Sequence, residues 1–74
     1  MKFTLEQLEE IAQGEIQGFM NVTYVEIEDE TSIRVDDNRD NSIWLYTDGT
    51  YNGEGLKPQF RAWLKEKGLT KITI

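Results

Sequence analysis

The densest group of oxygen-bearing side chains is residues 36–41, which read Asp-Asp-Asn-Arg-Asp-Asn. Asp36, Asn38 and Asp40 match the first, third and fifth ligand positions of a calcium-binding EF-hand loop. The last ligand position of that loop needs a bidentate glutamate, and here it is Thr47 between flanks of strand character. Asp and Asn are also favoured in turns, because their side chains bond nearby backbone. We interpret residues 36–41 as a turn, with weak cation binding as the alternative, and predict no metal site.

Residues 48–55 are rich in glycine and resemble a phosphate-binding loop only in composition. The Gly-x-x-x-x-Gly-Lys-Ser/Thr pattern is missing, and Asp48 and Glu54 would repel an anion. Small-ligand or cation binding by residues 36–41 or 48–55 is our alternative hypothesis for function.

The residue types for nucleophilic catalysis are nearly absent. The chain has no histidine and no cysteine, and Ser32 and Ser42 are its only serines. Carboxylates are plentiful, but acid–base chemistry needs a cleft that shifts their pKa values, which a domain of this size seldom offers. We therefore predict that the protein is not an enzyme and that it uses no cofactor.

The charge of the chain is unevenly distributed. Residues 1–54 carry thirteen carboxylates against three basic groups, a balance of −10, and residues 55–74 carry one carboxylate against five, a balance of +4. The total of −6 disfavours a nucleic-acid partner, because phosphate would be repelled. We expect the basic tail to fold back onto the acidic body.

Several classes of protein are disfavoured by composition alone. No apolar run approaches the roughly 20 residues of a membrane span, and no signal-peptide pattern is visible, so no membrane partner is expected. The lack of cysteine favours a cytoplasmic location. We take Met1 as the start of a short open reading frame and residues 1–74 as one small domain.

Two helices are predicted from their end signals. Thr4 and Gln7 form a capping-box pair at the start of a helix over residues 4–13, whose apolar residues recur at helical spacing. Gly14 weakens or ends this helix, and Gly18 ends it if Gly14 does not. Pro58 suits the first position of the second helix, and Gly68 suits the left-handed residue that ends it. Leu69 would then contact Leu64 in a Schellman motif.

Strands are predicted over residues 19–28, 31–35, 42–47 and 70–74, from β-branched and aromatic residues between polar turns. The first is apolar on both sides, which indicates a central strand or a bulge. Asp48-Gly49 either closes a further hairpin or opens a loop.

The resulting fold class is α+β, a two-layer sandwich in the order α-β-β-β-α-β. An antiparallel three-strand meander is followed by a C-terminal strand that we expect to run parallel to the third strand through a right-handed crossover. Both helices are expected on one face, the aliphatic side of the sheet.

The candidate site follows from alternation within Ile43-Trp44-Leu45-Tyr46, where the two aliphatic residues face inward and the two aromatic residues outward. The predicted protein-binding residues of that outer face are Arg34, Trp44, Tyr46, Tyr24, Glu26 and Glu28. Trp, Tyr and Arg are enriched at binding hot spots. Alternatively, residues 48–55 with Tyr51 fold over the rings and hide them.

These observations predict a small acidic non-catalytic interaction module that binds another protein, or itself, through an aromatic sheet face and acidic turns. A narrower hypothesis is a phage-type inhibitor whose carboxylates imitate phosphates at a basic site. The carboxylates assigned to that role are Glu26, Glu28, Asp29, Glu30, Asp36, Asp37 and Asp40. If Trp63 belongs to the core, Trp63→Ala should cost about 3–5 kcal/mol.

Overall fold

A computed structural model describes residues 3–37, 39, 41–53 and 55–72 of the chain. The elements are α1 (Leu5–Gln13), the 3-10 helix η1 (Glu15–Gly18), β1 (Val22–Asp29), β2 (Ser32–Asp37), β3 (Ser42–Tyr46), β4 (Thr50–Gly53), α2 (Pro58–Glu66) and β5 (Thr70–Lys71). The strands form one five-stranded mixed sheet in the order β1-β2-β3-β4-β5. The predicted α+β class is confirmed, as is the succession of helix, meander, helix and final strand, with one strand added.

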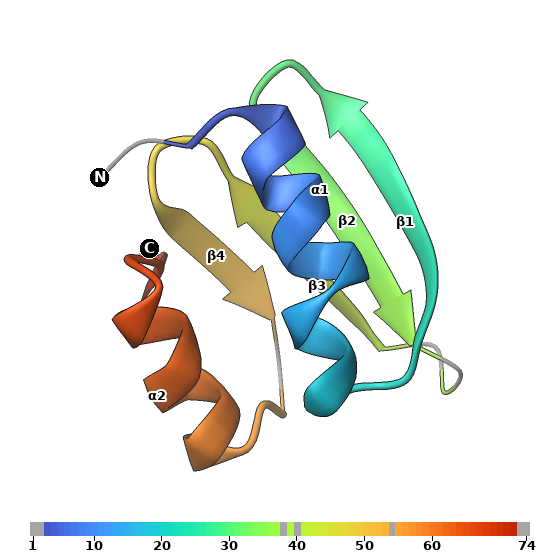
Figure 1. The fold of residues 1–74 in the computed structure, drawn as a ribbon, viewed down its shortest axis with the longest axis vertical. Coiled ribbons are helices and arrows are strands. Elements are labelled where there is room, and N and C mark those ends of the chain that lie inside the picture. The colour runs from blue at the N-terminus through green and yellow to red at the C-terminus, as the bar shows by residue number, and fades with distance from the viewer. Residues whose placement is uncertain (1–2, 38, 40, 54, 73–74) are drawn as a thin grey trace.

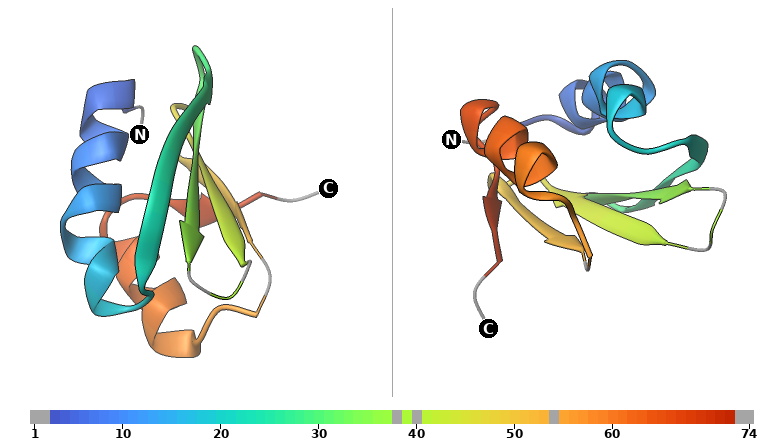
Figure 2. Two further views of the ribbon diagram at one scale, coloured as in Figure 1. Left: turned by 90° about the vertical axis from the view of Figure 1, so that its right-hand side faces the viewer. Right: turned by 90° about the horizontal axis from the view of Figure 1, so that it is seen from below.

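Both helices lie on the same side of the sheet, and no described segment forms a helix on the other side (Figures 1 and 2). This arrangement leaves the outer face of the sheet open in the described part of the chain. Because side chains alternate along a strand, each strand sends one set of residues toward the helices and the other set away.

The first helix begins as its capping chemistry predicts. The backbone N–H of Gln7 donates to Thr4 Oγ1 at 3.1 Å, and the N–H of Thr4 donates to Gln7 Oε1 at 2.9 Å. Gly14 ends α1, and η1 follows at once. The turn continues past η1, because the N–H groups of Phe19 and Met20 both donate to the carbonyl of Ile16, and the first strand therefore begins at Val22 and not at residue 19.

The fourth strand is the main addition to the predicted fold. Gly49 adopts the left-handed φ of 91°, and its N–H donates to the carbonyl of Tyr46 at 3.1 Å. Asp48 supports the turn, because its Oδ1 accepts the N–H of Thr50 at 3.0 Å. The hairpin alternative for Asp48-Gly49 is therefore confirmed, and the open-loop alternative is wrong.

The extra strand changes the partner of the last one. β5 runs parallel to β4, with Thr50 opposite Thr70 and Tyr51 opposite Lys71. The expectation that the last strand is parallel to the third strand is wrong, because β4 reverses the chain once more before α2 crosses back. The crossover is thus β4-α2-β5.

β1 lies at the edge of the sheet, so the central-strand interpretation is wrong. The bulge interpretation holds, since the pairing of β1 with β2 shifts register between Val22 and Tyr24 and again between Ile27 and Asp29. The first shift explains the two-sided apolar pattern, because it lets Val22 pack against the core while Tyr24 turns outward.

The second helix ends in the predicted Schellman motif. Gly68 has the left-handed φ of 92°. Its N–H donates to the carbonyl oxygen of Lys65 at 3.0 Å, and the N–H of Leu69 donates to the carbonyl oxygen of Leu64 at 2.9 Å. Leu64 and Leu69 are both fully buried, so this motif also anchors the chain that leads into β5.

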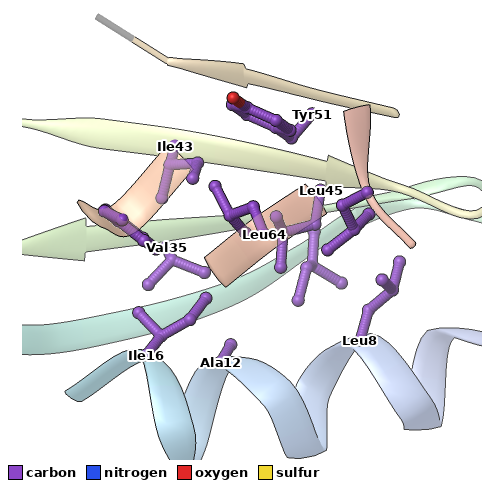
Figure 3. Packing of buried hydrophobic residues seen from close by; sticks show 11 residues of the cluster. Leu8, Ala12, Ile16, Val35, Ile43, Leu45, Tyr51 and Leu64 are labelled. Atoms are coloured by element: carbon purple, nitrogen blue, oxygen red, sulfur yellow. The ribbon is translucent and has the colours of Figure 1, made fainter. Parts of the chain in front are cut away.

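The core lies between the helices and the inner face of the sheet (Figure 3). Its buried residues are Leu8, Ala12, Ile16, Ile33, Val35, Ile43, Leu45, Tyr51, Phe60, Leu64 and Leu69. Side chains of α1 and η1 point toward those of β2 and β3 (Figure 3). Trp63 is only partly buried at the margin of this cluster, so the condition attached to its large predicted mutational cost is not met.

The basic tail contacts the acidic body at one ion pair in the described chain, where Lys67 Nζ lies 2.7 Å from Glu15 Oε2. Lys57, Arg61 and Lys65 are exposed on α2, and none has a carboxylate partner among the described residues. The tail does pack onto the body, through Phe60, Leu64 and Leu69 in the core, but its charge pairing with the body among the described residues is limited to the end of α2.

Candidate protein-binding face

The pairing of β2 with β3 builds the centre of the outer face. Arg34 lies directly opposite Trp44, and Ser32 lies opposite Tyr46. Ile33 and Leu45, one position along, are fully buried on the helix side. The predicted alternation of Ile43 to Tyr46 is therefore confirmed, and both aromatic rings lie away from the core with part of their surface exposed.

β1 extends this face to the edge of the sheet. Tyr24 lies opposite Asp36, and Glu26 lies opposite Arg34. Tyr24 is 51% exposed, which is high for a large ring. The bulge after Val22 places Tyr24 and Glu26 together on the outer face.

A network of carboxylates surrounds the Arg34 guanidinium. Nη2 lies 3.1 Å from Glu26 Oε2, Nη1 lies 3.1 Å from Glu28 Oε1, and Nε lies 3.3 Å from Asp36 Oδ2. The Nε contact is an ion pair without hydrogen-bond alignment. With 31% of the arginine side chain exposed, the network sits at the surface but holds the guanidinium in one orientation.

Asp36 belongs to this face although the sequence analysis assigned it to a turn. It lies within β2, two positions after Arg34, so strand periodicity puts both on the same side. Its carboxylate also accepts the hydroxyl of Ser42 on β3. The strand extends two residues beyond its predicted end at Val35, which is why the sequence analysis missed this role.

The described segments leave the outer face uncovered. Tyr51, expected in one alternative to fold over the rings, is instead in β4 and is 4% exposed within the core. That alternative is wrong, because the turn at Gly49 directs Tyr51 to the same side as its neighbour Leu45. The six predicted residues share the outer face of the sheet, and Figure 2 shows that both helices lie on the opposite side of the sheet.

The 36–41 region shows turn chemistry at its start. Asp37 Oδ1 accepts the N–H of Arg39 at 2.8 Å and that of Asn41 at 3.0 Å. These backbone donors stabilise the anion and lower the pKa of Asp37 below its ordinary value. Asn38 and Asp40, two of the three EF-hand-like positions, lie outside the described residues.

Neither candidate loop assembles a cation or phosphate site in the described chain. Gly53 is in β4, where the predicted glycine-rich loop becomes a strand, and Glu54 lies outside the described residues. Among the residues that are described, no group of three or more potential ligands is arranged to hold a metal ion.

Sequence reasoning also missed an aromatic cluster on the helix side. Phe19 stacks on Phe60 with ring centroids 5.1 Å apart and planes 3° apart, and it lies 5.2 Å from the Trp63 ring. Phe19 remains 40% exposed beside a cavity of about 250 Å³ between η1 and the start of α2. The sequence analysis assigned Phe19 to a strand, and this assignment hid the contact.

Neither described helix is long and apolar enough to cross a membrane. Comparisons with protein-family profiles, with characterised proteins and with solved structures each gave no match to this chain.

Proposed function

We propose that this chain is a small non-catalytic interaction module that binds another protein through the outer face of its sheet. One observation carries the proposal. Trp44 lies partly exposed beside Arg34, on a face that no described helix or loop covers. A face that carries partly exposed Trp and Tyr beside a held Arg has the composition of a binding hot spot.

The electrostatics of the face favour a basic partner. Glu26, Glu28 and Asp36 surround one guanidinium, so three carboxylates against one cation leave an excess of negative charge. The whole chain carries −6, which also speeds encounter with a positively charged surface. A partner with lysine or arginine around an apolar patch would match both the aromatic centre and the acidic rim.

The narrower inhibitor hypothesis uses the same rim. Three of the carboxylates assigned to phosphate imitation are already paired with Arg34, and Asp29 and Asp37 bond their own turns. Their charge is therefore partly compensated within the domain. Binding to a protein in general does not require these carboxylates to be free, and we therefore favour that form of the proposal.

Affinity capture tests the proposal. The immobilised chain is compared with Trp44→Ala and with Phe19→Ala, a matched loss of a partly exposed aromatic ring on the helix side. Circular dichroism first establishes that each variant folds. We expect a partner retained by the wild type and by Phe19→Ala, and bound at least about tenfold more weakly by Trp44→Ala.

Equal retention by all three proteins would contradict the proposal. Sedimentation at increasing protein concentration separates binding to another protein from self-association. A dimer that Trp44→Ala dissociates would identify the partner as a second copy of the chain.

A further inference from the structure

The long free edge of the sheet lies next to the proposed binding face. β1 is the outermost strand, and within the described residues it pairs with β2 alone. No described segment lies beyond it (Figure 1). An edge strand presents a row of N–H and C=O groups that can pair with a further strand.

The regular part of this edge is short and well defined. Register shifts on both sides confine continuous pairing with β2 to Tyr24–Ile27, and β5 at the opposite edge has only two residues. The edge therefore suits a short extended segment and not a long strand. Bulges of this kind limit uncontrolled pairing between sheets.

The two most exposed large hydrophobic residues of the described chain lie in this stretch. Tyr24 and Ile27 are each 51% exposed. Tyr24 lies on the outer face opposite Asp36, whereas Ile27 lies opposite the fully buried Ile33 and so faces the helix side. A strand added beside β1 would cover apolar surface on both faces of the sheet at once.

The charge of the edge selects among possible occupants. β1 carries Glu26, Glu28 and Asp29 and no basic residue. Two copies of β1 paired with each other would bring these carboxylates together, which disfavours a second copy of this chain. Glu26 and Glu28 share the single cation Arg34 with Asp36, and the negative charge left over would attract a strand with lysine or arginine on its outer side.

We propose that β1 accepts an extended basic segment of the partner protein as a sixth strand. Basic side chains of that segment lie opposite Glu26 and near Glu28 on the outer face, and aliphatic side chains alternate with them to cover Ile27 on the helix side. This inference rests on the proposed function and names the class of partner, a segment in which basic and aliphatic residues alternate.

Peptide titration followed by amide NMR tests the inference. The probe is a short capped peptide in which lysine and valine alternate. The first control peptide has the same composition, with the lysines and the valines in separate blocks. The second and third controls keep the alternating sequence but are N-methylated at every other residue. In each of these two, the methyl groups remove the N–H donors along one of the two hydrogen-bonding edges of the peptide. We expect the probe to shift the amides of Tyr24–Ile27, to slow their hydrogen exchange and to bind at about millimolar Kd.

The controls separate strand pairing from attraction between charges. All four peptides carry the same charge, so only backbone pairing and alternation distinguish them. We expect the block peptide and at least one N-methylated peptide to bind about tenfold more weakly than the probe. Equal binding by all four, or no detectable binding of the probe, would overturn the inference.

A pair of protein variants adds a second check. Ile27→Lys places a charged side chain on the helix side of the β1 edge, and a charge in that position blocks the addition of a strand. The control Gln59→Lys adds the same charge at an exposed position of α2. We expect the first to weaken probe binding about tenfold and the second to change it less than about twofold. Equal effects of the two variants would count against the edge.

The two proposals can fail separately. If the four peptides bind alike and shift the amides of Arg34, Trp44 and Tyr46, strand addition is wrong while binding at the sheet face stands. If Trp44→Ala captures its protein partner as well as the wild type does, the proposed function is wrong whatever the peptides do.

Discussion

Arg34 on β2 lies directly opposite Trp44 on β3, and three carboxylates from β1 and β2 hold its guanidinium. This relationship gives the outer face a polar frame around an aromatic centre. The helix side carries the fully buried core, whereas Trp44 and Tyr46 on the outer face stay partly exposed. We therefore expect substitutions on the helix side to lower mainly the stability of the domain, and substitutions on the outer face to weaken mainly its binding.

Alanine substitutions should rank the aromatic residues by burial. Phe60 is 3% exposed, so Phe60→Ala should lower the free energy of unfolding by about 3–5 kcal/mol. Trp44→Ala should cost about 1 kcal/mol. Trp63 is partly exposed like Trp44 but packs against the core cluster, so the cost of Trp63→Ala should fall between those two values. Urea denaturation followed by circular dichroism measures all three. A cost for Trp44→Ala equal to that of Phe60→Ala would show that the outer face packs against something.

Removing the cation of the carboxylate network should destabilise the sheet in a salt-dependent way. Arg34→Met leaves Glu26, Glu28 and Asp36 facing one another, and we expect a loss of roughly 1–2 kcal/mol at low ionic strength. Arg34→Lys, which keeps the charge but not the planar fork, should lose less. Denaturation in low and high salt checks this, and a cost of Arg34→Met that does not shrink in high salt would contradict it.

Two turn carboxylates should make stability fall in acid. The N–H of Thr31 donates to Asp29 Oδ1 at 2.8 Å and, with the Thr31 and Ser32 hydroxyls, lowers the pKa of Asp29 below 3.8. The backbone N–H groups of Arg39 and Asn41 donate to the Asp37 carboxylate and lower its pKa in the same way.

Because the folded pKa values lie below the unfolded ones, this stabilisation is fully present above the ordinary value of 3.8 and is lost as pH falls through the lowered values. Carboxyl NMR titration should show both shifts. In Asp29→Asn and Asp37→Asn the acid slope of the unfolding free energy should become shallower. An unchanged slope in both variants would refute this prediction.

Two glycines should respond oppositely to alanine. Gly68 has φ 92° at the end of α2, so Gly68→Ala should cost about 1–2 kcal/mol. Gly18 ends η1 without a positive φ, and a Cβ there meets no atom within 4 Å. Gly18→Ala should therefore be neutral or stabilise the fold by up to about 1 kcal/mol. Thermal unfolding of the two variants compares them directly, and equal losses would be inconsistent with the geometry at Gly68.

Much of the fold could be predicted because its signals are local. The Thr4–Gln7 capping box and the Schellman motif at Gly68 involve residues a few positions apart, so they operate almost independently of the rest of the chain. The alternation within residues 43–46 likewise predicted which side chains reach the core and which form the candidate face.

The remaining features depend on contacts between distant segments. Whether Thr50–Gly53 pairs with β3 or stays a loop depends on a buried place for Tyr51, and that choice decides which strand β5 joins. The carboxylates around Arg34 likewise come from two strands whose relative register a bulge sets. The sequence by itself therefore determined the two helices with their capping motifs and the inner side of residues 43–46. Only the tertiary structure decided which strands pair and in which register, because those choices depend on packing between residues far apart in the chain.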